Sequence, residues 1–246
     1  MPRNRAGARH CAFLDFDGTL VPFAPRPDGV RREPRLIALL ATLRERLGGA
    51  VAIVSGRPIA TLDALLAPLQ LPAAGLHGLE RRDAQGRRHG PDAPPAWMAA
   101  ARRAVAGYAR GNRGLRVEDK QHALAVHHRG APPRVAVVLR QFLLQLRDAA
   151  SSDAQVLDGD GVVELRAAGG DKAAAVAAFM AEPPYVGRTP VYIGDDVTDA
   201  PALAAVAALG GIAIGVADRI DAPWQLPDPA AVRAWLDELA ATARTP

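Results

Sequence analysis

The chain has 246 residues, 49% of them apolar, and is long enough for one large domain or a core with an insertion. Its net charge of +4 does not indicate a nucleic-acid-binding protein, because acidic and basic residues are interspersed and only 4% of residues are aromatic. One cysteine excludes a disulfide framework and fits a reducing compartment, and no run reaches membrane-spanning length, so we expect a cytoplasmic protein that does not bind a membrane. We also expect a monomer that does not bind nucleic acid.

Apolar runs of strand length alternate with helical periodicity toward both ends of the chain. The predicted strands are Cys11–Phe16, Ala50–Val54, Val191–Ile193 and Ile212–Val216. The predicted helices are Pro34–Leu47, Ile59–Leu66, Asp171–Met180, Ala200–Ala208 and Ala230–Ala241. Fully apolar strands that alternate with helices favour an α/β fold, a doubly wound parallel sheet covered on both faces.

The middle of the chain, residues 81–166, has a different pattern. Helices are predicted at Ala96–Tyr108 and Arg134–Asp148, with alternating strands at Leu115–Lys120 and Ala123–Arg129. Two more alternating runs flank the turn Asp158-Gly159-Asp160-Gly161, and Ala149–Asp153 is a short polar link. We therefore predict an α+β unit over 81–166, inserted into a core made of residues 1–80 and 167–246.

Two aspartates directly follow the first predicted strand. Asp15 and Asp17, within Asp-Phe-Asp-Gly-Thr-Leu, lie where a buried strand meets a turn that glycine permits, a usual position for ligand sites in α/β sheets. Their mutual repulsion requires a cation, and Mg²⁺ is the first candidate. One carboxylate can then attack an electrophile while the other transfers protons. The alternative is a turn with two solvated acids.

Three later segments carry compatible chemistry. Ser55-Gly56-Arg57-Pro58 combines a hydroxyl, an unobstructed N–H and a helix start, which suits phosphate oxygens, although Ser55 could simply cap the helix. Lys172 begins a helix, where a cation is unfavourable, so its side chain should point toward an anion. The carboxylates in Gly194–Asp199 require a cation or solvent.

In chain order these segments resemble the four motifs of the haloacid-dehalogenase-like phosphohydrolases, with a large α/β cap between the second and third. The resemblance implies that Asp15 is phosphorylated and that Asp17 is the general acid/base. The implied phosphate-binding residues are Ser55, Gly56, Gly18 and the catalytic Lys172. The resemblance also implies Mg²⁺ bound by Asp15, the Asp17 backbone carbonyl and Asp195, with Asp199 holding metal-bound water.

Segments over nearly the whole chain resemble the trehalose-6-phosphate phosphatases. These segments are Phe13–Leu20, Gly75–Glu80, Val117–Arg129, Val162–Arg166 and Gly194–Asp199. In that family a cap strand reads Glu-Asp-Lys before a His-Tyr-Arg end, as Glu118-Asp119-Lys120 and His127-His128-Arg129 nearly do here. The implied substrate-binding residues are Glu118, Lys120, Glu164, Arg57, His77, Gly78 and Arg129.

The residue types of the predicted cap strand also suggest a function without reference to the family. On a strand, Glu118 and Lys120 face one way and Asp119 the other, so a carboxylate and an ammonium can bind vicinal sugar hydroxyls. Only two of the chain's 30 basic residues are lysines, which favours a specific role for Lys120 and Lys172. The alternative is a cross-strand surface ion cluster that includes Glu164.

The sequence departs from the family pattern at six positions. These departures concern which sugar is bound, and none removes an acid or base of the four motifs. They are Gln121, Ala123, His128, Ala173, Ala200 and Leu203. We therefore predict a Mg²⁺-dependent phosphomonoesterase that acts on a sugar phosphate, namely trehalose 6-phosphate. The alternatives are a phosphatase for sucrose phosphate or mannosylphosphoglycerate, a phosphomutase, and a non-catalytic phosphosugar sensor.

Overall fold

The computed structural model describes residues 9–24, 29–150, 153–159 and 161–243, and the chain forms two compact units. The first unit comprises Met1–Gly90 and Gly170–Pro246, and the second comprises Pro91–Gly169. The insertion thus begins at Pro91, whereas the sequence placed its start at Arg81. The reason is that Glu80–Arg82 forms a strand that pairs with Ala73–Gly75 of the first unit.

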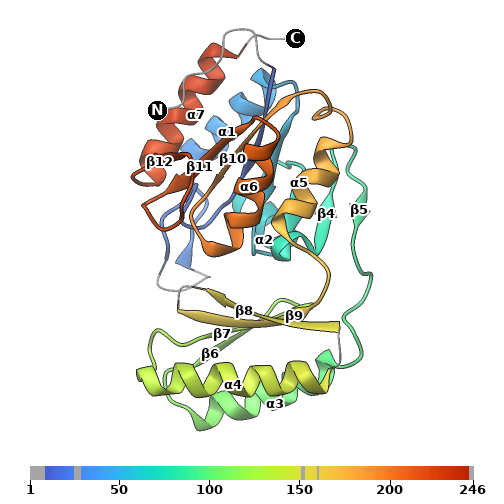
Figure 1. Cartoon of the computed structure of the whole chain (residues 1–246), viewed down its shortest axis with the longest axis vertical. Helices are drawn as coiled ribbons and strands as arrows, with labels where there is room; N and C mark the ends of the chain where they lie inside the picture. Colours follow the sequence, from blue (N-terminus) through green and yellow to red (C-terminus); the bar gives the residue numbers. More distant parts are fainter. Residues whose placement is uncertain (1–8, 25–28, 151–152, 160, 244–246) are drawn as a thin grey trace. The chain divides into compact units, whose positions relative to one another are not determined.

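The first unit contains an eight-stranded sheet in the order β12-β11-β10-β1-β2-β3-β4-β5 (Figure 1). The strands are β1 (His10–Leu14), β2 (Val51–Val54), β3 (Ala73–Gly75), β4 (Glu80–Arg82), β5 (Arg88–His89), β10 (Thr189–Gly194), β11 (Ile212–Val216) and β12 (Trp224–Leu226). Neighbouring strands from β12 to β3 are parallel, and β4 and β5 are antiparallel. In the centre, Ala12 of β1 lies opposite Val191 on one side and Val51 on the other.

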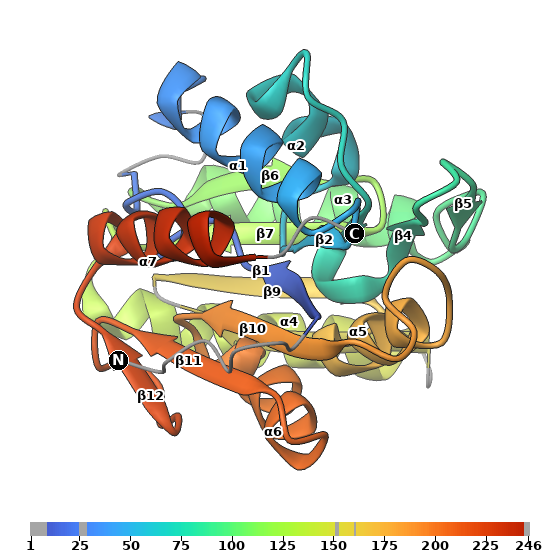
Figure 2. The same cartoon turned by 90° about the horizontal axis from the view of Figure 1, so that it is seen from above.

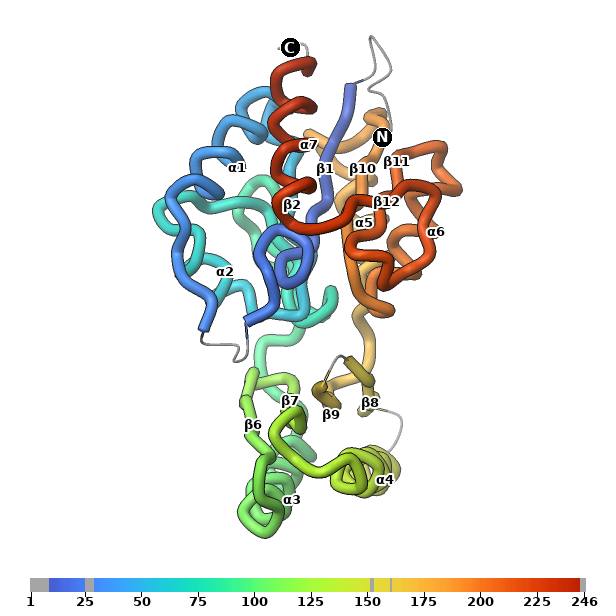
Figure 3. Tube along the Cα trace, turned by 90° about the vertical axis from the view of Figure 1, so that its left-hand side faces the viewer, coloured from blue at the N-terminus to red at the C-terminus, as the bar shows by residue number. Residues whose placement is uncertain are grey.

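Helices cover both faces of this sheet (Figure 2). They are α1 (Pro34–Arg46), α2 (Ile59–Leu66), α5 (Lys172–Met180), α6 (Ala200–Ala208) and α7 (Pro229–Thr242). Leu14 and Ile53 pack in one core with α1, α2 and α7, and α1 lies beside α7 (Figure 3). Phe13 and Tyr192 pack in a second core with α5 and α6. Alternate residues of each strand therefore supply opposite cores, which confirms the predicted doubly wound α/β core.

The second unit is a four-stranded antiparallel sheet with two helices on one face (Figure 3). Its elements are α3 (Met98–Gly111), β6 (Arg116–Asp119), β7 (Ala123–His127), α4 (Pro133–Ala149), β8 (Ala154–Gly159) and β9 (Val162–Ala167), with strand order β6-β7-β9-β8. Leu124 and Leu165 pack with Leu139 of α4. Glu118, Ala125 and Glu164 lie in one cross-strand row. By strand alternation this row belongs to the face without helices.

The predicted turn and polar link of the insertion are described only in part. Asp160 of the predicted turn, and residues 151–152 of the polar link, are outside the described residues.

Within the described ranges, no helix combines the length and the apolar character that crossing a membrane requires.

Candidate active site

The candidate catalytic side chains follow the carboxyl ends of adjacent strands. Asp15 follows β1, Ser55 follows β2 and Asp195 follows β10, and these three strands are neighbours in the parallel part of the sheet. The backbone N–H of Asp15 donates to the Ile193 carbonyl at 3.0 Å, which ties the first motif to the last. Parallel pairing therefore brings segments far apart in the sequence to one edge of the sheet, where α/β proteins bind ligands.

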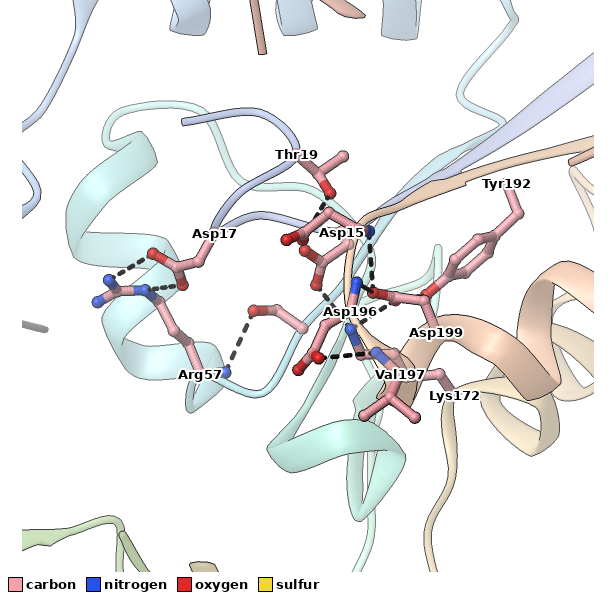
Figure 4. Close-up of polar contacts among 11 residues, drawn as sticks. Asp15, Asp17, Thr19, Arg57, Lys172, Tyr192, Asp196, Val197 and Asp199 are labelled. Atoms are coloured by element: carbon pink, nitrogen blue, oxygen red, sulfur yellow. Dashed lines mark hydrogen bonds and ion pairs between the residues drawn. The ribbon is translucent and has the colours of Figure 1, made fainter. Parts of the chain in front are cut away.

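Lys172 joins two of the carboxylates. Its Nζ donates to Asp15 Oδ1 at 2.7 Å and to Asp199 Oδ1 at 2.6 Å, and all three side chains are buried (Figure 4). A cation is unfavourable at the start of α5, but Asp171 caps this helix by accepting from the Ala174 N–H at 2.6 Å. The lysine side chain thus points toward anions, which is what the sequence predicts for a lysine at a helix start.

Burial and charge shift the pKa values of the cluster. Burial raises the pKa of Asp15 well above its usual value, against the lowering effect of Lys172, and Asp199 raises it further. Burial, with Asp199 nearby, raises the pKa of Asp195 to about 7. Burial alone would lower the pKa of Lys172, but Asp15 and Asp199 outweigh it, so the ammonium stays charged. One ammonium therefore faces three buried carboxylates, and the excess of negative charge favours binding of a further cation.

Asp199 organises the loop that carries Asp195. Its Oδ1 accepts from Lys172 and, at 2.6 Å, from the Tyr192 hydroxyl. Its Oδ2 accepts from the backbone N–H groups of Asp195 at 3.2 Å and Asp196 at 3.0 Å. Gly194 makes room for this arrangement, since a Cβ there would lie 2.4 Å from Asp199 Cγ. Both oxygens of Asp199 are thus already used to hold Lys172 and the loop.

The residues present fit a divalent cation. One oxygen each of Asp15, Asp195 and Asp199 lies within 4.8 Å of the others. Because both oxygens of Asp199 accept hydrogen bonds, Asp15 and Asp195 are the candidate direct ligands. Asp195 Oδ1 accepts from Thr19 Oγ1 at 3.2 Å, whereas its buried Oδ2 has no hydrogen-bond partner among the described residues. Gly18, at φ +83°, leaves space beside this oxygen, because a Cβ there would lie 2.3 Å from it. A buried carboxylate oxygen without a hydrogen bond, beside other carboxylates, is the environment that Mg²⁺ occupies in proteins.

Asp17 lies apart from the cluster and is bound by Arg57. The guanidinium donates from Nε to Asp17 Oδ2 at 2.5 Å and from Nη2 to Oδ1 at 2.7 Å (Figure 4). Such a two-point contact fixes both the position and the plane of a carboxylate. The sequence suggested a substrate contact for Arg57, and the structure shows its guanidinium bound to Asp17. The backbone N–H of Arg57 donates to Ser55 Oγ at 3.2 Å, so this hydroxyl supports the turn that presents the arginine.

His77 and Gly78 form a tight turn near the start of α5. Both have positive φ, 57° for His77 and +97° for Gly78. A Cβ on Gly78 would lie 2.4 Å from the Asp171 carbonyl oxygen, and one on Gly56 would lie 2.6 Å from the His77 ring. These residues therefore pack the loop after β2 against the segment that begins α5, next to the candidate phosphate-binding residues.

The remaining candidate residues belong to the second unit. Lys120 Nζ donates to Glu164 Oε2 at 2.7 Å, and His127 Nε2 lies 3.0 Å from Glu118 Oε2. Arg129 packs over Gly161, where a Cβ would lie 2.2 Å from its Cγ. These two contacts place carboxylates and an ammonium in one polar row, Glu118, Lys120 and Glu164, on the helix-free face. This row is compatible with a sugar site and with a surface ion cluster.

Three contributors to the site were not predicted. Thr19 lies within the first motif, and its place two residues after Asp17 was a usable signal. Tyr192 lies in an apolar strand, where nothing distinguishes a tyrosine that bonds a carboxylate from one that only fills the core. Arg219 Nη1 lies 3.8 Å from Asp195 Oδ2, and no motif in the sequence marks this arginine.

Comparison with known proteins assigns the family. Residues 13–220 match the trehalose-phosphatase family. The chain is 36% identical over 237 residues to the trehalose-6-phosphate phosphatase of Escherichia coli K12, covering 94% of this chain and 86% of that protein. It is 41% identical over 210 residues to a "Probable trehalose-phosphate phosphatase" of Sinorhizobium fredii, covering 85% of this chain and 78% of that protein.

A solved structure shares the fold. The C-terminal domain of the Candida albicans trehalose-6-phosphate phosphatase superposes with a TM-score of 0.82 at 20% identity, covering 96% of this chain and 94% of that one. A haloacid dehalogenase-like hydrolase from Bacteroides thetaiotaomicron superposes with a TM-score of 0.64 at 14% identity, covering 93% and 98%. These likenesses confirm the predicted fold class, and the match over residues 13–220 shows that the chain belongs to the trehalose-phosphatase family.

Proposed function

We propose that this protein is a Mg²⁺-dependent phosphomonoesterase that hydrolyses trehalose 6-phosphate to trehalose and phosphate. The observation that carries the proposal is the buried cluster in which Lys172 bridges Asp15 and Asp199, in a chain of the trehalose-phosphatase family. The named activities of the relatives from E. coli and S. fredii support the choice of substrate. The single buried cysteine supports a reducing, cytoplasmic location, and we expect a monomer.

In the proposed reaction, Asp15 is the nucleophile. A carboxylate oxygen of Asp15 attacks phosphorus in line with the departing sugar oxygen, forming an aspartyl phosphate as the P–O bond to the sugar breaks. Lys172, at 2.7 Å from Asp15, favours the ionised form of this carboxylate against the effect of burial and balances charge on the phosphoryl oxygens. Ser55, Gly56 and Gly18 are proposed to contact those oxygens.

Asp17 is proposed to transfer the protons. It protonates the departing sugar oxygen and then accepts a proton from the water that hydrolyses the aspartyl phosphate. Arg57 is proposed to orient Asp17 through the two-point contact at 2.5 and 2.7 Å, because a proton donor acts only within hydrogen-bond distance of its acceptor. Both steps return Asp15 and Asp17 to their starting forms.

Mg²⁺ is the proposed cofactor. Asp15 and Asp195 would hold it with the Asp17 backbone carbonyl, and Asp199 would stand nearby, in line with the buried oxygens of the acidic cluster. When bound, the ion polarises phosphoryl oxygens and neutralises charge in the transition state.

The sugar is proposed to be recognised through the polar row of the second unit. Glu118, Lys120 and Glu164 provide acceptors and a donor for hydroxyl groups. His77, Gly78 and Arg129 are further candidate contacts. A release assay over trehalose 6-phosphate, sucrose 6-phosphate, mannosylphosphoglycerate and glucose 6-phosphate tests the substrate. A higher kcat/KM for another member of this panel, or no release from any, would reject trehalose 6-phosphate.

The two lysines provide a sharper test. We expect Lys120→Ala to lower kcat/KM for trehalose 6-phosphate by about 1–3 kcal/mol, or about 5- to 150-fold, and to leave p-nitrophenyl phosphate hydrolysis nearly unchanged. Lys172→Ala should impair both substrates, because it acts on the phosphoryl group. Arg102→Ala is the matched control, since it removes the Arg102–Asp119 ion pair within the same unit but outside the polar row. Equal effects of Lys120→Ala on both substrates, or none, would reject a sugar-binding role.

A further inference from the structure

Arg219 approaches a buried oxygen of the acidic cluster, Asp195 Oδ2, that has no hydrogen-bond partner among the described residues. Its Nη1 lies 3.8 Å from Asp195 Oδ2, too far for a hydrogen bond but close enough for a strong charge interaction. The Asp195 side chain is 1% exposed and that of Arg219 is 43% exposed. The arginine thus reaches a buried carboxylate from the surface.

The backbone before Arg219 has an uncommon conformation. Ala217 and Asp218 both have positive φ, 61° and 51°, and neither is glycine. This conformation is unfavourable for residues other than glycine and persists where surrounding contacts enforce it, often near functional sites. Ala217 is held by a hydrogen bond from its N–H to the Leu226 carbonyl at 2.8 Å. The turn after β11 is therefore fixed in the form that presents Arg219.

An aromatic ring supports the guanidinium. Arg219 lies over Phe23, with its Cζ 4.7 Å from the ring centroid. Phe23 also touches the glycine of the first motif, since a Cβ on Gly18 would lie 2.5 Å from Phe23 Cε2 and 2.3 Å from Asp195 Oδ2. Cation–π contact restrains an arginine without neutralising it. The ring and the strained turn together keep a full positive charge beside Asp195.

We propose that Arg219 competes with the divalent cation for Asp195 and thereby sets the Mg²⁺ concentration at which the site fills. This inference rests on the proposed Mg²⁺ site. A carboxylate that interacts with a guanidinium is a weaker ligand, and the guanidinium repels a second cation. For a unit charge and a divalent ion roughly 5 Å apart in water, the repulsion corresponds to about tenfold in affinity, and salt reduces it.

Calorimetric titration of the chelator-treated full chain with MgCl₂ tests the proposal. At 50 mM KCl we expect Arg219→Gln to bind Mg²⁺ about three- to tenfold more tightly than the unsubstituted protein. Arg219→Lys keeps the charge and should stay within about twofold. Raising KCl to 500 mM should reduce the difference for Arg219→Gln to less than about twofold, because screening weakens the repulsion.

Arg140→Gln is the matched control. It makes the same change in net charge by removing an exposed ion pair to Asp158 at 2.8 Å, in the other unit, and should leave Mg²⁺ affinity unchanged. Equal or weaker Mg²⁺ binding by folded Arg219→Gln would overturn the proposal. If that variant instead lost affinity for inorganic phosphate with unchanged Mg²⁺ binding, Arg219 would be an anion contact, which also overturns it. Absence of Mg²⁺ binding by the unsubstituted protein would reject the proposed metal site itself.

Discussion

Replacing Lys172 with methionine tests the charge balance of the buried cluster. Methionine has nearly the same length and keeps the packing, but it removes the ammonium that lies 2.7 Å from Asp15 and 2.6 Å from Asp199. Removing one member of a buried ion pair typically costs 3–5 kcal/mol, because the partner charge stays buried without compensation. We therefore expect Lys172→Met to lower the free energy of unfolding by about 3–5 kcal/mol at pH 8 in a chelator, a large share of a typical total.

The loss should shrink as the pH falls. Burial already raises the pKa of Asp195 to about 7 and that of Asp15 well above its usual value, and without Lys172 these carboxyls should protonate still more readily. A carboxyl with a raised pKa in the folded state contributes stability that is present below its unfolded pKa, near 4, and is lost as pH rises through the folded value. The deficit of the variant should therefore be smaller at pH 5.5 than at pH 8.

Urea unfolding followed by circular dichroism at both pH values measures this deficit. Arg140→Gln, which breaks an exposed ion pair with Asp158, is the control and should change the free energy of unfolding by less than about 1 kcal/mol. A Lys172→Met protein as stable as the unsubstituted one at pH 8, or a deficit that grows toward pH 5.5, would refute the reasoning.

Three further predictions concern the same edge of the sheet. Asp15→Asn should fold normally and lower kcat at least about a thousandfold, as an amide cannot form the acyl phosphate; substantial phosphate release would contradict this. Chelation should abolish phosphate release, Mg²⁺ should restore it and Ca²⁺ should restore it poorly, whereas full activity in excess chelator would exclude a metal. Gly18→Ala should weaken Mg²⁺ binding in calorimetry at least about tenfold, since its Cβ would lie 2.3 Å from Asp195 Oδ2; unchanged binding would place the ion elsewhere.

The sequence predicted the long elements of the fold better than the short ones. The buried strands β1, β2, β10 and β11 were recognised because burial on both faces leaves a largely apolar run in each. The three-residue strands β3, β4 and β12 and the two-residue β5 were missed. Strands this short have no measurable periodicity, and β4 contains Arg81 and Arg82, whose burial depends on distant partners, Glu182 and Asp63.

The candidate site was likewise predicted only in part. Motif positions predicted which carboxylates would stand at strand ends, because strand and turn are local properties of the sequence. The sequence did not reveal that Arg57 binds Asp17, that Tyr192 donates to Asp199 or that Arg219 reaches Asp195. Arg57 and Arg219 are each presented by a loop, whose direction depends on the three-dimensional packing of segments that lie far apart in the chain.

The central position of β1 has a consequence for synthesis of the chain. His10–Leu14 pairs on one side with β2, which follows soon, but on the other side with Thr189–Gly194, which leaves the ribosome only after the whole inserted unit. Until then a largely apolar strand presents an unpaired backbone edge, the feature that promotes aggregation of nascent chains. An insertion that folds by itself shortens the effective loop between β2 and β10 and lowers the entropy cost of closing the sheet. Early folding of the second unit would therefore protect the first strand of the protein from non-native pairing.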